Sequence, residues 1–265
     1  MMKRWTAVEI KALKGKERWA MLTAYDALSA QWVESAELPV VLVGDSLGMT
    51  SLGYESTLPV SMEAMLHHTA AVSRVTRRAL VVADMPFMSY QPSVACGIAN
   101  AGRFVQEAGA DAVKVEGGVI RAALIEALVA NGVPVLGHVG LTPQSVKELG
   151  GYRVQGQGEA EARQLMDDAL AVEQAGAFAV VLECVPRALS EQITEALSIP
   201  TVGIGAGAGC DAQVLVISDL LGLSGKKVPS FVRPFAALAP QIEEAVAAFK
   251  QAVVSGDFPG DKESF

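Results

Sequence analysis

The chain has 265 residues, 51% of them hydrophobic, and a formal net charge of −8. That length fits one α/β domain, which we expect to cover residues 1–265. The acidic balance argues against nucleic acid as a partner, because binding phosphates needs clustered Lys and Arg. We also expect no membrane contact, because no apolar run reaches the roughly 18 residues of a membrane helix.

The cysteines and the start of the chain indicate a cellular location. The cysteines are Cys96, Cys184 and Cys210, and no two of them lie at a metal-ligand spacing. No apolar stretch that could serve as a signal peptide follows the charged residues 1–16. We therefore predict a reduced, cytoplasmic protein without disulfides.

Short apolar runs recur along the chain, and each ends in a polar or glycine-rich turn. They are rich in Val, Leu and Ile and too continuous for half-exposed strands, so they predict buried parallel strands. In chain order these runs are 19–23, 40–44, 80–83, 112–115, 134–137, 179–182, 201–205 and 214–218.

Segments of helical length separate most of these runs. The alternation of strand and helix predicts a parallel sheet, and eight strands in one domain of this size predict a closed (β/α)₈ TIM barrel. Two segments depart from the repeat: the link 206–212 is too short for a full helix, and a long glycine-rich stretch, 141–158, follows the fifth strand. The predicted helices are 27–37, 61–77, 94–108, 120–130, 159–175, 188–197 and, delayed beyond the eighth strand, about 235–255.

Charged or imidazole side chains close five of the predicted strands. They are Asp45, Asp84, Glu116, His138 and Glu183, at strands two to six. In such barrels the carboxyl ends of the strands form the catalytic face. Several carboxylates at one mouth require a metal or a shared proton, and Mg²⁺ suits an oxygen-rich site best. The alternative is that some of these acids are helix N-caps in the turns after the strands.

Lys114 lies two residues before Glu116, so both side chains are expected on the same side of their strand. A buried lysine needs a partner. It would neutralise either a carboxylate substrate or one of the acids. The alternative is a structural ion pair with Glu116.

Ordered short motifs cover nearly the whole chain. In one-letter code they are MLTAYD (21–26), LVGDSLGM (42–49), STLPV (56–60), ADMPFM (83–88), VKVEGG (113–118), GHVGLTPQS (137–145), GGYRVQG (150–156), LECVP (182–186) and GIGAG (203–207). With these motifs in this order, the chain closely resembles the ketopantoate hydroxymethyltransferase family. Two departures from the family pattern are peripheral: Ala212 in place of a usual glycine, and Glu263 where histidine is frequent.

The resemblance implies a reaction. A hydroxymethyl group would pass from 5,10-methylenetetrahydrofolate to 3-methyl-2-oxobutanoate, giving 2-dehydropantoate in pantothenate biosynthesis. The reaction would proceed through a magnesium-stabilised enolate. The resemblance also implies a homo-oligomer, a decamer by the family's pattern.

The resemblance implies roles for the strand-end residues. Asp45, Asp84 and Glu116 match magnesium ligands, and Glu183 matches the proton acceptor. The substrate-binding positions that it implies are Asp45, Ser46, Asp84, Lys114 and His138.

Two other classes of protein remain open. One is a related barrel lyase or mutase that makes an enolate from a keto acid, although no cysteine lies in a loop where such lyases often carry their acid. The other is a catalytically silent barrel that serves as an interaction protein, which should lack the strand-end acids.

Overall fold

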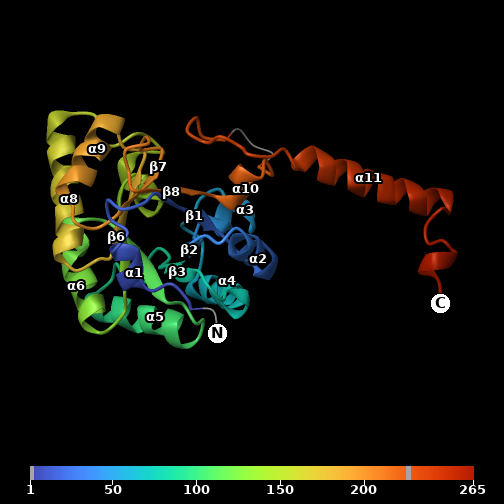
Figure 1. Cartoon of the computed structure of the whole chain (residues 1–265), viewed down its shortest axis with the longest axis horizontal. Coiled ribbons are helices and arrows are strands. Elements are labelled where there is room, and N and C mark those ends of the chain that lie inside the picture. The colour runs from blue at the N-terminus through green and yellow to red at the C-terminus, as the bar shows by residue number, and fades with distance from the viewer. Residues whose placement is uncertain (1–2, 225–227) are drawn as a thin grey trace. The chain divides into compact units, whose positions relative to one another are not determined.

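A computed structural model describes residues 3–224 and 228–265. Its strands are all parallel and close into a barrel in chain order, with β1 paired to both β2 and β8. Figure 1 shows helices α5, α6, α8 and α9 on the outside of this barrel. The strands are β1 Trp19–Thr23, β2 Val40–Val43, β3 Leu80–Asp84, β4 Ala112–Glu116, β5 Val135–Gly140, β6 Ala179–Glu183, β7 Thr201–Ile204 and β8 Ala212–Leu215. The predicted TIM barrel is confirmed.

Helices and short turns connect the strands. Helices α2, α4 and α5 start at side-chain caps: the Asp26 Oδ1 accepts the Ser29 N–H at 2.7 Å, and Ser61 and Ser93 cap α4 and α5 in the same way. The helices are α1 Ala7–Lys11, α2 Ala27–Ser35, α3 Leu47–Thr50, α4 Met62–Val75, α5 Val94–Gln106, α6 Ala122–Ala130, α7 Val146–Leu149, α8 Glu159–Gln174 and α9 Arg187–Ala196, with the 3₁₀ turns η1 Val119–Arg121 and η2 Pro143–Ser145.

The core lies inside the barrel and at its amino end. Strands β2, β3 and β4 are buried at every position, which explains their unbroken runs of apolar residues. Ile10 of α1 is fully buried in a cluster with residues that begin strands, such as Val40 and Leu80. Helix α1 therefore closes the amino end of the barrel.

The predicted bounds of the eighth strand are wrong. The sequence predicts a strand at 214–218, whereas β8 is Ala212–Leu215 and residues Ile217–Leu220 form the helix α10. The strand starts early because Ala212 pairs with both Trp19 of β1 and Val202 of β7. The apolar run 214–218 is thus divided between a strand and a helix, which periodicity alone does not separate.

Contacts divide the chain into two compact units, Met1–Val216 and Ile217–Phe265. The second unit contains α10, α11 Ala239–Ser255 and η3 Asp261–Glu263. Helix α11 begins four residues later than predicted, at Ala239, with a proline in its first turn. The expectation of one domain over residues 1–265 stays a prediction, and its first two residues lie outside the described ones.

One face of α11 is apolar and exposed. Ile242, Val246, Phe249 and Val253 follow one another at helical spacing and are 48–63% exposed. None of the helices in the described ranges has the length and apolar character needed to cross a membrane.

Candidate active site

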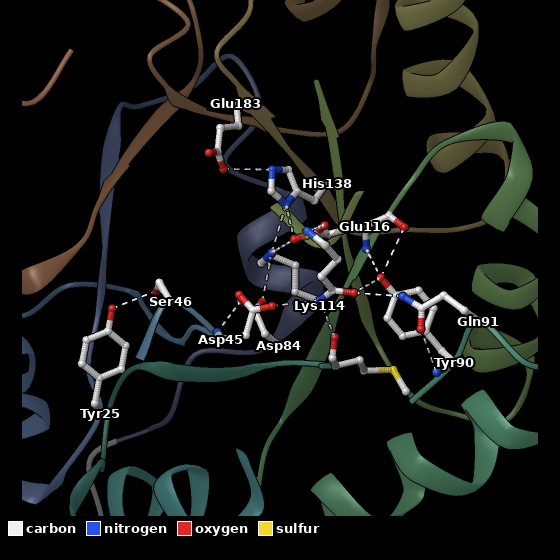
Figure 2. Close-up of polar contacts among 12 residues, drawn as sticks. Tyr25, Asp45, Ser46, Asp84, Tyr90, Gln91, Lys114, Glu116, His138 and Glu183 are labelled. Atoms are coloured by element: carbon white, nitrogen blue, oxygen red, sulfur yellow. Dashed lines mark hydrogen bonds and ion pairs between the residues drawn. The ribbon is translucent and has the colours of Figure 1, made fainter. Parts of the chain in front are cut away.

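Strand register brings the predicted side chains together at the carboxyl end of the barrel. Asp84 of β3 pairs with Lys114 of β4, and Glu116 of β4 pairs with His138 of β5. Lys114 and Glu116 are two apart on one strand and face the same side. Figure 2 shows Asp45, Asp84, Lys114, Glu116 and His138 as one connected group.

Asp45 enters this group through a tight turn after β2. Its backbone N–H donates to the Asp84 Oδ2 at 3.0 Å. A side chain at Gly44 would meet the Ser46 Oγ at 2.7 Å and the Asp84 Oδ2 at 3.5 Å. The glycine therefore permits the close approach of the two acids, as expected for a crowded turn.

Lys114 is the cation of the group. Its Nζ lies 3.1 Å from the Asp84 Oδ1 and 4.0 Å from the Glu116 Oε1. Burial alone would lower the pKa of Lys114, but the surrounding carboxylates outweigh burial and hold that pKa above the ordinary lysine value. Lys114 is thus charged and pairs more closely with Asp84 than with Glu116, so the predicted alternative of a simple Lys114–Glu116 pair is incomplete.

His138 connects Lys114 to Glu183. The Lys114 Nζ lies 3.0 Å from the His138 Nδ1, and when that nitrogen accepts from the lysine the neutral ring carries its proton on Nε2. That Nε2 lies 3.2 Å from the Glu183 Oε2, close enough for electrostatic attraction but misaligned for a hydrogen bond. The Glu183 side chain is 17% exposed against 3% for His138, so Glu183 is the more accessible group.

The surroundings shift the pKa values of the three inner acids, Asp45, Asp84 and Glu116, in different directions. Burial raises the pKa of Asp45 well above its usual range, and the charges of Asp84 and Glu116 raise it further. Burial also raises the pKa of Asp84, although Lys114 opposes this. Burial would raise the pKa of Glu116 too, but His138 and Lys114 lower it below its ordinary value. The carboxylates repel one another with only partial compensation, as sites for cations do.

The donor set fits a hard cation. Within residues 3–224 and 228–265, the Asp84 Oδ1 and Glu116 Oε1 are buried oxygens without a hydrogen-bond partner. In the same ranges, no three His, Cys, Asp or Glu side chains stand close enough together to hold an ion as they are arranged. The oxygens are thus of the right chemistry for Mg²⁺, while two of the three acids are drawn toward Lys114.

The helix-cap alternative for these acids is wrong. The helices that follow β2, β3 and β6 have Ser46, Ser93 and Pro186 at their N-cap positions, and η1 after β4 has Gly118. Asp45, Asp84, Glu116 and Glu183 are therefore free of a capping role. Ser46 lies beside Asp45, and its Oγ is 2.9 Å from the Tyr25 hydroxyl, at one edge of the group in Figure 2.

Comparisons with known proteins identify the family. The family model described as "Ketopantoate hydroxymethyltransferase" matches residues 4–261. The chain belongs to the ketopantoate hydroxymethyltransferase family. A 3-methyl-2-oxobutanoate hydroxymethyltransferase of Syntrophus aciditrophicus (strain SB) is 54% identical over 98% of this chain and 96% of its own. One of the same description from Thermobifida fusca (strain YX) is 52% identical over 99% and 94%. The predicted family and enzyme class are confirmed.

Solved structures support the fold of this hydroxymethyltransferase family member. A phosphoenolpyruvate phosphomutase from Streptomyces platensis subsp. rosaceus has a TM-score of 0.64 at 15% identity and covers 95% of this chain and 88% of its own. A 2,3-dimethylmalate lyase has a TM-score of 0.62 at 18% identity, with coverages of 98% and 91%. At such identities the likeness shows the barrel fold alone, so it gives no support to the lyase or mutase alternative.

Two residues of the group were not singled out from the sequence. Gln144, in the turn η2, is 5% exposed and contacts both Asp45 and Glu116. Tyr90 follows β3, and its hydroxyl accepts the Glu116 N–H at 3.2 Å. Gln144 belongs to the family motif at 137–145, and that motif was the only sequence signal that pointed to it.

Backbone hydrogen bonds attach the long segment 141–158 to the carboxyl end of β6. The Leu141 N–H donates to the Glu183 carbonyl at 2.8 Å, and the Gln155 N–H donates to the Cys184 carbonyl at 2.9 Å. Cys184 has a left-handed backbone, with φ of 50°, which turns the chain immediately after Glu183. A side chain at Gly140 would come within 2.3 Å of the Glu183 carbonyl oxygen. The backbone around Glu183 is therefore closely packed.

Proposed function

We propose that this protein transfers a hydroxymethyl group from 5,10-methylenetetrahydrofolate to 3-methyl-2-oxobutanoate, giving 2-dehydropantoate for pantothenate biosynthesis. Family membership supports the reaction. The observation that carries the assignment of roles is the gathering of Asp45, Asp84, Lys114 and Glu116 at one end of the barrel, with Glu183 beyond His138.

Mg²⁺ would be held by Asp45, Asp84 and Glu116. The buried Asp84 Oδ1 and Glu116 Oε1 lie near the Lys114 Nζ but accept no hydrogen bond from the described residues, and as hard oxygen donors they support this assignment. When bound, the ion would supply Lewis-acid stabilisation of negative charge on the ketone oxygen of the keto acid.

Lys114 and Ser46 would bind the keto acid. The charged Lys114 gives an acidic site a buried cation that can attract a carboxylate substrate and stabilise its enolate. Ser46 would orient the substrate through its hydroxyl, which the Tyr25 hydroxyl already positions at 2.9 Å.

Glu183 would accept the proton from C3 of the keto acid. The inner acids face Lys114 and one another, whereas Glu183 is separate from them and more exposed. His138 would hold the Glu183 carboxylate by electrostatic attraction, with its Nε2 3.2 Å from the Glu183 Oε2, and would line the substrate pocket. The segment 141–158, fastened near Glu183, would keep water from the enolate.

A product assay tests the reaction and the metal separately. The purified protein is incubated with the keto acid and 5,10-methylenetetrahydrofolate, and 2-dehydropantoate is measured with chelator and after Mg²⁺ is restored. We expect turnover that chelator abolishes and Mg²⁺ recovers. Absence of folate-dependent product under every condition would contradict the reaction, whereas full activity in chelator would contradict only the metal.

We also propose assembly into a homo-oligomer, with the decamer of the family as the expected state, in the cytoplasm. The free cysteines Cys96, Cys184 and Cys210 support a reducing compartment. The exposed apolar face of α11 supports contact with another copy.

Sedimentation velocity tests the assembly. Phe249→Asp, on the apolar face of α11, should yield a smaller species than the wild type. Val254→Asp is the matched control, because Val254 is 74% exposed and lies off that face. Equal sizes for wild type and Phe249→Asp would remove α11 from the interface.

A further inference from the structure

In each of the three proposed metal ligands, one carboxylate oxygen accepts a hydrogen bond from a protein N–H. The Gln144 Nε2 donates to the Asp45 Oδ2 at 3.0 Å, and the Gln144 backbone N–H donates to the Glu116 Oε2 at 3.0 Å. The Asp84 Oδ2 accepts the Asp45 N–H, also at 3.0 Å. Two of these three hydrogen bonds therefore come from Gln144, which is not itself a proposed metal ligand.

The side-chain amide of Gln144 is held in one orientation by four partners. Its Nε2 also donates to the Met85 carbonyl at 2.9 Å. Its Oε1 accepts the Tyr90 hydroxyl at 2.8 Å and the Gln91 Nε2 at 2.9 Å. Reversing the amide would place donors against donors and acceptors against acceptors, so the N–H toward Asp45 is determined by the surroundings. Figure 2 shows Tyr90 and Gln91 on the Glu116 side of the group.

These hydrogen bonds determine how the carboxylates can bind an ion. An oxygen that accepts an N–H faces a partial positive charge, and its carboxylate cannot rotate without losing the bond. Asp45 and Glu116 are therefore prepared to offer one oxygen each. Single-oxygen ligands suit Mg²⁺, which demands a small octahedral shell, whereas Ca²⁺ accepts more oxygens and two-oxygen carboxylates.

We propose that Gln144 is a positioning residue that keeps Asp45 and Glu116 as single-oxygen ligands and so favours Mg²⁺ over Ca²⁺ at this site. The proposal rests on the metal role given above. It assigns to Gln144 a selection among cations, which a residue that merely fills the core would not exert.

Calorimetric titration of the protein with Mg²⁺ alone and with Ca²⁺ alone tests the proposal. Gln144→Met keeps the length of the side chain and removes the amide. We expect its Mg²⁺ affinity to fall about 10- to 100-fold, as for other outer contacts of metal ligands. The Ca²⁺ affinity should fall less, so the ratio of the two affinities should shift toward Ca²⁺.

Asn100→Leu is the matched control. The Asn100 Nδ2 donates to the Ser89 carbonyl at 2.6 Å, so this variant also loses an amide beside the segment that carries Tyr90, without touching an acid. We expect its ratio of affinities to equal that of the wild type. An unchanged ratio in Gln144→Met, with Mg²⁺ still bound by the wild type, would overturn the role of Gln144 and leave the metal intact. Absence of Mg²⁺ binding in the wild type would overturn both.

Tyr90→Phe provides a second test if Gln144→Met does not fold. It removes the hydroxyl that holds the Gln144 Oε1 and leaves the amide in place. The ratio of affinities should shift in the same direction by a smaller factor. A folded Tyr90→Phe protein with the wild-type ratio would contradict the orientation of Gln144 by this network.

Discussion

Acids at the two ends of the barrel have opposite surroundings. At the amino end, Asp111 and Asp211 each directly precede a strand and are fully engaged. The Asp111 Oδ2 accepts the Val81 N–H at 2.9 Å and lies 3.2 Å from the Arg4 Nη1. The Asp211 Oδ2 accepts the Thr201 N–H at 2.8 Å and pairs with the Lys14 Nζ at 2.9 Å.

At the carboxyl end the acids are poorly compensated. Burial and neighbouring carboxylates raise the pKa of Asp45, whereas at the other end hydrogen bonds from Thr201 and the charge of Lys14 outweigh burial and lower the pKa of Asp211. Aspartate thus stabilises the fold at the amino end of the barrel, whereas at the carboxyl end it is repelled by neighbouring carboxylates. This division is the one expected between the stability face and the catalytic face of a barrel.

The largest expected effect comes from Glu183→Gln. This change keeps the shape of the side chain but removes its ability to accept a proton, so turnover should fall by about 10²- to 10⁴-fold. Mg²⁺ and keto-acid binding, measured by calorimetry, should stay close to wild type, because Glu183 lies apart from the inner acids.

Hydrogen exchange at C3 of the keto acid in deuterated water, followed by NMR without folate, isolates the proton transfer if the wild type exchanges. Loss of exchange in Glu183→Gln would match its assignment as the base. Exchange at the wild-type rate would move the role to another group, and His138 would be examined next.

Lys114→Met should have the next largest effect. It removes the buried cation between Asp84 and Glu116 and leaves their repulsion uncompensated. We expect kcat/KM to fall about 10²-fold, equivalent to about 3 kcal/mol, with the metal still bound. Unchanged kcat/KM in steady-state kinetics would reduce Lys114 to a structural role.

Asp211→Asn should affect stability and leave the chemistry alone. Loss of the charged hydrogen bonds at the amino end should lower the free energy of unfolding by about 1–3 kcal/mol. Because the folded protein lowers the pKa of Asp211, its contribution is fully present above the unfolded value of about 3.9 and is lost as the pH falls through the lower folded value.

Chemical denaturation at several pH values measures this contribution. The difference between wild type and Asp211→Asn should be largest near neutral pH and vanish in acid. Michaelis constants at neutral pH should be the same for the two proteins. A large fall in kcat would show that the two ends of the barrel are not independent.

Much of the site was predictable because it follows from local rules. Two-residue periodicity places Lys114 beside Glu116, and the barrel rule brings the ends of neighbouring strands together. The contacts of Gln144 were not predictable in this way. They depend on how the segment 141–158 folds back across the ends of several strands, which neither periodicity nor spacing reports. The predicted boundary of β8 was wrong for a similar reason, because pairing with β1 and β7 determines where the strand begins.

Closure of the barrel joins the first strand to the last, with Trp19 opposite Ala212. During synthesis, one edge of β1 therefore stays unpaired until residues almost 200 positions further along the chain have been made. At a translation rate of about 5–20 residues per second, that delay is about 10–40 s. An open strand edge is a template for intermolecular pairing throughout this interval. A nascent chain that stops before β8 emerges therefore retains this unpaired edge.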